Sequence, residues 1–543
     1  MKHETANHPE DLVDYNLFTS NAALADALER EGAGAARARL TELGARLGTR
    51  EMFALGDAAN RNPPVLKLFD RFGHRLDELE FHPAWHELMR RLVAEGLHTS
   101  PWAEPRPGAH AERAAAYMLW GEIENGTQCP ATMTYGAVPA LARQRDDFAP
   151  WMPRLLSRDY DPRLIPIEQK RGALMGMGMT EKQGGSDVRA NTTRATPAGA
   201  PGPGREYRIT GHKWFFSAPM CDAFLVLAQA AGGLSCFFVP RLLPDGTRNA
   251  LYLQRLKDKL GNRSNASSEV EFEDTYGVLV GDEGRGVPTI LEMGVYTRLD
   301  CAIGAAGIMR QCVAQAVHHG RHRSAFGKLL VDQPLMKNVL ADLALECEGA
   351  IALAIRLARA FDSQQDEDEA ALRRLLTPVA KYWICKRAPA VGAEAMEVLG
   401  GNGYVEEGPI ARRFRELPLN GIWEGSGNVM CLDMLRALAR EPRAGEALAA
   451  LLHRSRGADA RFDRYVARLL EDLRDAAGEE ACARILTERI ALATQASILL
   501  QGGADFVAES FISSRLVTGA PGAFGALPAS LDHGALLERV LRR

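Results

Sequence analysis

The sequence predicts an α+β fold in which a β-rich segment separates two helical regions. Before about residue 170 and after about residue 290, apolar residues recur with helical spacing. Between these regions, short runs rich in β-branched and aromatic residues are punctuated by Gly, Pro and Asp, as strands are. A chain of 543 residues also exceeds what one hydrophobic core usually supports, so several domains are expected.

Residues 1–174 are expected to form a helical N-terminal domain. The stretch SNAALADALEREG begins with a polar cap, continues with helical apolar spacing and ends at Gly. HPAWHELMRRLVAEGL and HAERAAAYMLWGEIENG repeat the same pattern farther along the chain.

Three further segments follow. Residues 175–290 are expected to form a middle β-domain, with strand-like runs such as DAFLVLAQAAGG and SSEVEFEDTYGVLVG. Residues 291–440 return to long helical patterns and are expected to form a helical bundle. Residues 441–543 are expected to add a helical C-terminal extension.

Composition excludes several classes of protein. The net charge of −4 gives no global reason to expect a nucleic-acid partner, so such a partner needs a local basic patch. Nine scattered cysteines form no C-x-x-C pair, which argues against a disulfide framework and a zinc site. No apolar stretch is long enough to span a bilayer, and the polar N-terminus lacks the apolar core of a signal peptide. A cytoplasmic protein without a membrane partner is therefore expected.

Two stretches at the start of the β-rich segment could meet a flat or phosphorylated ligand. MGMTEKQGGSDV (177–188) offers backbone N–H groups and a hydroxyl at Gly185 and Ser186, although such a run is also an ordinary turn. GHKWFFSAP (211–219) carries Trp214 and Phe216, which could lay an aromatic face on a planar cofactor or simply fill the core.

Two stretches in the second helical region suit a dinucleotide. In RHRSAFGKLLVDQP (321–334), the fork of Arg323 suits a pyrophosphate, Phe326 can pack on an adenine and Gln333 can read its edge. The alternative is a plain helix–turn–helix corner with a solvated Arg. Farther on, glycines around Gly401 interrupt a helix and permit close approach of a ligand.

The stretch NGIWEGSGNVM (420–430) places Glu424 between Trp423 and the run Gly425-Ser426-Gly427. Charged Glu is rarely buried unless it is paired, and no salt-bridge partner stands nearby in the sequence. The residues therefore admit two readings, a solvated turn or a positioned catalytic base.

These five stretches occur in the order found in the acyl-CoA dehydrogenase family, which residues 170 to 435 resemble. The resemblance implies a helical N-terminal domain, a middle β-domain and a helical bundle, with FAD between the last two. It implies that a neighbouring subunit's FAD meets Arg323, Phe326 and Gln333, and hence a homo-oligomer. The residues that it places at FAD are Met179, Thr180, Gly185, Ser186, Trp214, Phe216, Ser217, Arg323, Phe326, Gln333, Gly401, Trp423, Ser426 and Asn428.

The same resemblance makes Glu424 the catalytic base. It would remove the α-proton of an acyl thioester while the β-hydrogen leaves as hydride to the flavin. Family analogy supplies the backbone N–H of Glu424 and a flavin hydroxyl as donors to the developing enolate. Desolvation beside Trp423 is expected to raise the pKa of the carboxylate. A purely structural Glu is the alternative.

Three departures from the usual family pattern narrow the resemblance. Lys182, Gln183 and Gly184 replace a common Pro-Ala pair, Trp423 stands where Tyr is common, and a long helical extension follows the bundle. In these respects nearly the entire chain resembles the AidB type of the family. That resemblance implies a homotetrameric flavoprotein of the response to DNA alkylation damage, with double-stranded DNA as a partner.

A local basic stripe is compatible with DNA binding. Residues 436–470 contain eight Arg against four acidic residues. Because no groove-reading motif is visible, contacts from Arg436, Arg440 and Arg443 would be made to phosphates. The alternatives are a solvated helix face of mixed charge and a conventional metabolic acyl-CoA dehydrogenase with no nucleic-acid role.

Overall fold

The computed structural model describes residues 6–363, 365–475, 479–517 and 522–542. Its residues gather into two compact units. Unit 1 comprises residues 1–53, 106–123 and 298–543, and unit 2 comprises residues 54–105 and 124–297. These units cut across the domain boundaries expected at 174 and 440, because the N-terminal helices are shared between the units and the extension belongs to unit 1.

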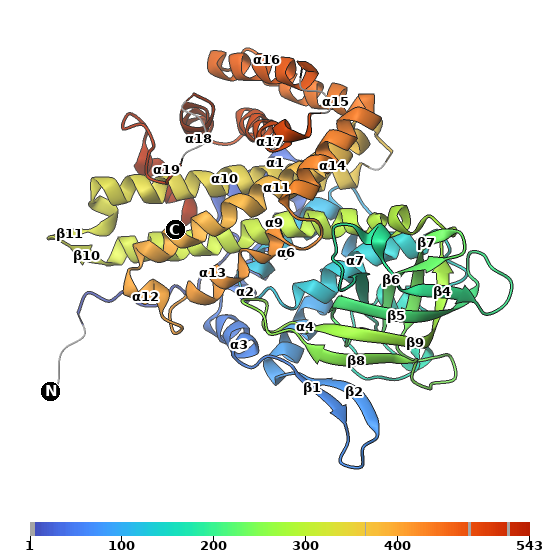
Figure 1. The fold of residues 1–543 in the computed structure, drawn as a ribbon. Helices are drawn as coiled ribbons and strands as arrows, with labels where there is room; N and C mark the ends of the chain where they lie inside the picture. The colour runs from blue at the N-terminus through green and yellow to red at the C-terminus, as the bar shows by residue number, and fades with distance from the viewer. Residues whose placement is uncertain (1–5, 364, 476–478, 518–521, 543) are drawn as a thin grey trace, which may run out of the picture. The chain divides into compact units, whose positions relative to one another are not determined.

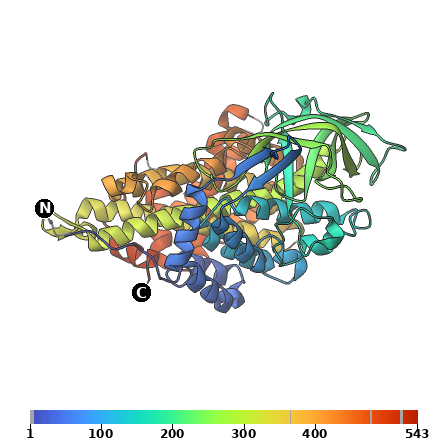
Figure 2. The ribbon, with the colours of Figure 1, turned by 90° about the horizontal axis from the view of Figure 1, so that it is seen from below.

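Unit 2 contains a seven-stranded sheet whose pairings close on themselves (Figures 1 and 2). β5 pairs with β3, β4 and β9, β9 continues to β7, and β7 pairs with β6, which returns to β3 and β4. The expected middle β-domain is therefore present as a barrel-like sheet. Its strands are β3 (Met175–Thr180), β4 (Arg194–Pro197), β5 (Glu206–Ser217), β6 (Ala223–Ala230), β7 (Gly233–Pro240), β8 (Leu251–Leu256) and β9 (Ser267–Val280).

Burial patterns distinguish strands that are buried on both faces from strands that have one face toward solvent. β6 and β7 are nearly continuous apolar runs and are almost wholly buried, as central strands are. β5 and β9 alternate between buried and more exposed residues, which suits strands with one face toward solvent. The α-helices that lie wholly in this unit are α4 (Pro83–Ala94), α5 (Ser100–Ala103), α7 (Gln128–Ala142) and α8 (Met152–Leu155).

The expected helical N-terminal region also contains two strands that the sequence did not reveal. β1 (Val65–Phe69) and β2 (Arg75–Glu80) form an antiparallel hairpin within it. The strand VLKLF is short and rich in Val, Leu and Phe, and its exposure alternates along the strand. Asp70 stabilises the turn, since its carboxylate accepts hydrogen bonds from the backbone N–H groups of Phe72 and His74.

Unit 1 is helical, with α10 at its centre (Figure 1). α10 packs against α1, α6, α11, α17 and α19, so its middle turns are buried on every side. The bundle comprises α1 (Ala22–Arg30), α2 (Arg37–Leu47), α3 (Arg50–Arg61, shared with unit 2), α6 (Ala109–Gly121), α9 (Gly286–His322, in this unit from residue 298), α10 (Pro334–Asp362), α11 (Glu367–Val398), α12 (Gly401–Tyr404), α13 (Ala411–Glu416) and α14 (Gly427–Arg440). A short hairpin, β10 (Ser324–Ala325) and β11 (Lys328–Leu329), joins α9 to α10.

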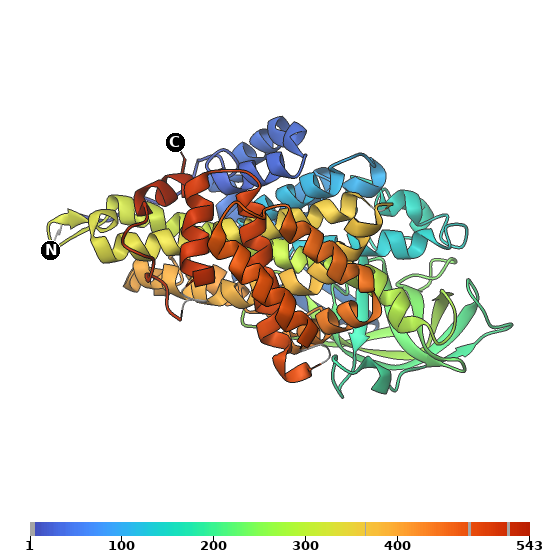
Figure 3. The same ribbon diagram turned by 90° about the horizontal axis from the view of Figure 1, so that it is seen from above.

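The C-terminal extension is packed onto the bundle. It comprises α15 (Pro442–His453), α16 (Ala460–Asp475), α17 (Ala483–Leu500), α18 (Asp505–Phe511), a π-helical stretch (Ile512–Val517) and α19 (His533–Val540). α17 lies across α10 and α11 (Figure 3). Across the described ranges, no helix combines the length and apolarity needed to cross a bilayer.

Buried ion pairs reinforce this packing. Arg515 is buried and donates to Asp342 of α10 at 2.5 Å and to Glu346 at 3.2 Å. Arg539 of α19 pairs with Glu348 of α10 at 2.5 Å. The extension therefore supplies the counter-charges for three carboxylates of the central helix.

Candidate active site

The Glu424 loop, defined as residues 420–427, leads from a 3₁₀ turn (Leu419–Gly421) into α14 of unit 1. Glu424 has φ of 59° and Gly425 has φ of 107°, so two consecutive residues lie in the left-handed region. A non-glycine residue in that region costs on the order of 1–3 kcal/mol and persists only where surrounding contacts hold it. The conformation of Glu424 is therefore imposed by its neighbours.

Those neighbours are two cations from adjacent helices. Lys381 of α11 donates its ammonium to the backbone carbonyl of Trp423 at 2.8 Å and also to the carbonyl of Gly425. Nε of Arg298, in α9, donates to the carbonyl of Glu424 at 3.0 Å. Three consecutive carbonyls of the loop are thus held by two side chains.

The charges near the loop are unevenly paired. Asp433 of α14 accepts from Arg298 at 3.0 Å and from Arg374 at 2.8 Å. Lys381 is only 1% exposed and makes no ion pair within the part of the chain that the structure describes. Nε1 of Trp423 donates to Oδ1 of Asn420 at 2.9 Å, which fixes the indole beside the loop.

Residues after Glu424 expose polar groups at the start of α14. Ser426 occupies the N-cap position, but its hydroxyl makes no capping hydrogen bond to the first turn. Oδ1 of Asn428 accepts from Nε of Arg484, in α17, at 2.8 Å. The first-turn N–H groups and a hydroxyl therefore suit a polar or anionic ligand, and the extension reaches this helix start.

The β10–β11 hairpin brings together the three residues predicted for adenosine diphosphate. Phe326 is fully exposed at its tip, with φ of 53°. Nε2 of Gln333 donates to the carbonyl of Ala325 at 2.9 Å, which ties the start of α10 to the hairpin. Arg323 donates to the carbonyl of Asn7 at 2.6 Å, so the N-terminal segment orients its guanidinium.

Gly401 begins α12, directly after Gly400 with φ of 60°. A Cβ at Gly401 would meet nothing within 4 Å. The surface there is open to a ligand or a second chain, and the neighbouring Tyr404 is largely exposed.

In unit 2, pairing of β3 with β5 unites several predicted residues. Met177 lies opposite Ser217 and Thr180 lies opposite Phe215, with an irregularity between the two pairs. Gly185 packs so closely on Thr180 that a Cβ would lie 2.5 Å from its Oγ1. Met179 and Thr180 are half-buried, and Ser186 is exposed in the following turn.

The structure corrects the prediction that Phe216 lays an aromatic face on a cofactor. Phe216 is 0% exposed and packs against Phe224 and Phe272, so its ring belongs to the barrel core. Phe215 is 51% exposed and is the aromatic side chain that this strand presents to solvent. The ring of Trp214 is half-buried, with Nζ of Lys257 3.5 Å from its centroid.

A buried ion pair anchors this end of β5. Nζ of Lys213 lies 2.8 Å from Oε1 of Glu181, and both side chains are almost inaccessible. Burial alone would raise the pKa of Glu181, but Lys213 and the hydrogen bonds of Thr192 and Thr193 outweigh it and lower the pKa to about 2. The pair holds the segment that follows Thr180 against the barrel.

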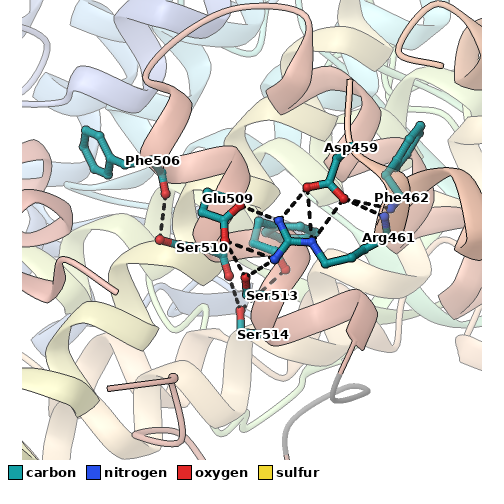
Figure 4. Close-up of polar contacts among 9 residues, drawn as sticks. Asp459, Arg461, Phe462, Phe506, Glu509, Ser510, Ser513 and Ser514 are labelled. Carbon is teal, nitrogen blue, oxygen red and sulfur yellow. Dashed lines mark hydrogen bonds and ion pairs between the residues drawn. The ribbon is translucent and has the colours of Figure 1, made fainter. Parts of the chain in front are cut away.

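The basic stripe at 436–470 contains two kinds of arginine. Arg443 pairs with Glu367 at 2.6 Å and with Asp368 at 2.9 Å. Arg461 lies between Asp459 and Glu509 and also donates to Ser513 (Figure 4). The other arginines are exposed and make no ion pair within the described residues: Arg436, Arg440, Arg454, Arg456, Arg464 and Arg468.

Apart from Gly401 at the start of α12, the residues predicted for the cofactor and the base thus form three local groups. The group from Met179 to Ser217 belongs to unit 2, whereas the hairpin group and the Glu424 loop belong to unit 1. The sequence reasoning missed Phe215, because an irregularity between Lys213 and Phe216 breaks the alternation of β5 and exposes this ring. It also missed Lys381 and Arg298, for which no local signal exists.

Comparison with known proteins gives a consistent result. The chain matches the N-terminal domain of the adaptive response protein AidB over residues 7–162, the middle domain of acyl-CoA dehydrogenases over 176–275 and their C-terminal domain over 284–439. The AidB protein of Escherichia coli (strain K12) is 52% identical over 479 residues, which cover 88% of each chain.

Solved structures agree with these sequence matches. Caenorhabditis elegans ACDH-11 in complex with C11-CoA is 25% identical with a TM-score of 0.84, and the match covers 100% of this chain and 94% of that chain. The apo form of Bd2924 is 30% identical with a TM-score of 0.83, and the match covers 91% of this chain and 99% of that chain.

Proposed function

This chain belongs to the acyl-CoA dehydrogenase family, in its AidB branch, and we propose that it oxidises an acyl thioester with Glu424 as the base. The observation that supports this role most directly is the left-handed backbone at Glu424, which is held by Lys381 and Arg298. Strained residues of this kind cluster where a side chain must be positioned for chemistry.

FAD is the cofactor, and its proposed ligands suit it. The hairpin group offers a guanidinium for a pyrophosphate and an exposed aromatic ring for an adenine. The start of α14 offers N–H groups and the Ser426 hydroxyl, and the β3–β5 pair offers the hydroxyls of Thr180 and Ser217 with the exposed ring of Phe215. When bound, FAD supplies the acceptor for the β-hydride.

The proton step requires only residues of this chain. The carboxylate of Glu424 accepts the proton from the α-carbon, and the electron pair that remains forms an enolate. The fixed loop holds the carboxylate at one position, so little reorganisation accompanies the transfer. A substrate with a CoA thioester is proposed by analogy with the C11-CoA complex of ACDH-11.

The decisive experiment is Glu424→Gln. The amide is nearly the same shape but cannot take the proton, so FAD content should be unchanged while anaerobic flavin bleaching by butyryl-, isovaleryl- or undecanoyl-CoA is abolished. The control is Glu394→Gln, a second Glu of unit 1 outside the Glu424 loop. Equal bleaching by the parent and Glu424→Gln would place the base elsewhere.

We propose a homotetramer in a reducing, cytoplasmic compartment. Large apolar side chains are exposed on the β10–β11 hairpin (Phe326), at the start of α10 (Leu335) and on α12 (Tyr404), and a second copy would cover them. All nine cysteines lie in the described part of the chain and are free, as expected of such a compartment. Phe326→Ser should lower both the mass measured by light scattering and the FAD content.

A second function, binding of double-stranded DNA that protects it from alkylation, is supported by the six exposed arginines without ion pairs. Since exposed guanidinium groups suit phosphates, binding should be largely independent of sequence. Arg436, Arg440 and Arg464 replaced together by Ala should flatten the dependence of log affinity on log salt by about 0.9 for each phosphate that the variant no longer neutralises.

The matched control removes three ion-paired arginines, Arg443, Arg461 and Arg489. Because acidic partners already neutralise them, their loss should leave the salt slope near that of the parent. An equal slope in the parent and in the Arg436/Arg440/Arg464 variant would exclude these contacts. It would favour a conventional metabolic dehydrogenase with no nucleic-acid role.

A further inference from the structure

We propose that Lys381 is the positioning residue of the Glu424 loop and that its ammonium supplies a fixed positive charge beside the proposed base. The inference rests on the proposed role of Glu424. It adds a residue from α11, outside the loop and outside the groups that bind the cofactor or substrate.

The hydrogen bonds carry the positioning role. Lys381 bonds the carbonyls of the residues on either side of Glu424, and Arg298 bonds the carbonyl between them. The backbone can turn three successive carbonyls toward two cations only if it leaves the extended conformation, and φ of 59° at Glu424 is that turn. Removal of Lys381 would release two of the three restraints.

The burial of Lys381 carries the electrostatic role. An ammonium that is 1% exposed requires hydrogen bonds and usually a counter-ion. Carbonyl oxygens provide the hydrogen bonds but carry no net charge, and no carboxylate pairs with Lys381 in the described part of the chain. Apart from the proposed base itself, no carboxylate contact therefore offsets this positive charge beneath the loop in the described residues.

The other groups around the loop do not cancel that charge. Asp433 is shared by Arg298 and Arg374, so its single negative charge is already opposed. Burial raises the pKa of the Cys301 and Cys385 thiols, which lie near Lys381, so both stay neutral. Lys386, on the next turn of α11, is exposed and adds a solvated positive charge.

A fixed positive charge at this place serves the reaction twice. It favours the ionised carboxylate of Glu424 before proton transfer, and it favours the enolate that carries the negative charge afterward. The proton passes from the α-carbon to Glu424 while the positive charge stays in place. Lys381 touches neither substrate nor cofactor in this scheme and acts through the loop.

The first experiment measures the loop itself, without substrate. Lys381→Met keeps the aliphatic stem and loses the ammonium, so hydrogen exchange over residues 420–430 should accelerate by about tenfold or more. The matched control is Glu397→Gln, which removes an exposed charge from the same helix and should leave this exchange unchanged. Exchange in Lys381→Met at the parent rate would overturn the positioning role.

The second experiment measures the charge through the pH profile of anaerobic flavin reduction, with butyryl-, isovaleryl- and undecanoyl-CoA as probes. Loss of a nearby positive charge raises the pKa of a carboxylate, so the midpoint in Lys381→Met should move upward by about one pH unit. Lys381→Arg retains the charge and should keep the parent midpoint, even at a reduced rate. A merely structural role would lower the rate of Lys381→Met without moving its midpoint, and that result would overturn the electrostatic role.

Glu424→Gln in the same series separates the two proposals. Bleaching in Glu424→Gln would refute the proposed base, while the exchange measurement would still test Lys381. Suppose instead that Glu424→Gln is inactive, while Lys381→Met shows the parent's exchange rate and the parent's pH midpoint. That result would refute the role of Lys381 and leave the proposed base in place. If Lys381→Met does not fold, Lys381→Gln, which also lacks the charge, must show the shifted midpoint, and a parent midpoint in it would overturn the inference.

Discussion

Two lysines, one in each unit, are each 1% exposed and yet are held in different ways. Lys213 of β5 faces the carboxylate of Glu181 at 2.8 Å. Lys381 of α11 faces the backbone carbonyls of Trp423 and Gly425. The first cation is neutralised by its partner, whereas the second is solvated by dipoles and keeps its field.

The difference separates an ion pair with a purely structural role from a cation that can also act on the reaction. A buried pair of opposite charges fixes two elements, but it exerts little force on a third group because the two fields cancel. A buried cation on carbonyls orients the backbone and also acts on charges that form nearby. Each of the following predictions tests this distinction.

The largest expected effect comes from Lys213→Met. This change strands the buried carboxylate of Glu181 and should destabilise unit 2 by about 3–5 kcal/mol. Lys381→Met leaves two neutral carbonyls without a donor and should cost about 1–3 kcal/mol. Calorimetric unfolding of both variants measures the difference, and Lys213→Met with Glu181→Gln should recover much of the loss. Equal destabilisation by the two single variants would contradict the comparison.

The dependence of stability on acid pH should also distinguish the two lysines. Because the folded state holds the pKa of Glu181 at about 2, below its ordinary value of 4.5, its contribution is present above pH 4.5. That stability is lost as the pH falls from 4.5 toward 2. Lys213→Met should show a weaker acid dependence of the unfolding midpoint over this range, whereas Lys381→Met should show the parent's dependence.

A third buried charge, Glu122 of unit 1, has no such partner and gives an intermediate effect. Neither carboxylate oxygen has a hydrogen-bond partner among the described residues, and burial raises its pKa to about 7. The folded state therefore holds a proton that the unfolded state releases near pH 4.5, so stability falls as the pH rises from 4.5 to 7. Glu122→Gln should remove this slope and stabilise the protein at pH 8 by about 3 kcal/mol. Unfolding midpoints at pH 5 and pH 8 measure it, and an unaltered slope would assign the dependence to another group.

The smallest effect is expected at Arg484, an exposed cation that donates to the neutral side chain of Asn428. Solvent screens its charge, so Arg484→Ala should weaken FAD retention by about 1 kcal/mol or less, the value of one hydrogen bond. Arg474→Ala, which removes an exposed arginine that bonds only its own helix, is the control. Equal FAD dissociation constants for the two variants would show that the extension does not support the cofactor loop.

Local patterns predict much of the fold and part of the site. The run FLVLA in β6 and the punctuation around it indicate the barrel strands from the sequence alone. Arg323, Phe326 and Gln333 lie on or beside one tight hairpin, and so short a segment leaves few alternatives. The hairpin at β1 and β2 escapes prediction because its strands are short and lie between two strong helical patterns.

Long-range partners are beyond local patterns. Lys381 lies 42 residues before Trp423, and nothing in AKYWICK distinguishes it from a lysine on a solvated face. Phe215 and Phe216 differ by one register step, and the irregular pairing of β3 with β5 decides which ring faces solvent. Arg443 resembles an available charge in the sequence, but α11 places Glu367 and Asp368 beside it.

The arginines that the extension sends into the bundle also limit how this chain can be shortened. Without Arg515 and Arg539, the carboxylates of Asp342, Glu346 and Glu348 would lie in the core with fewer opposite charges. A shorter descendant would have to replace those acids by apolar residues before it lost the extension. Until then, each deletion intermediate would be less stable than either end point. The acidic residues of the core therefore make the C-terminal extension necessary for stability, whatever ligand the surface of the extension binds.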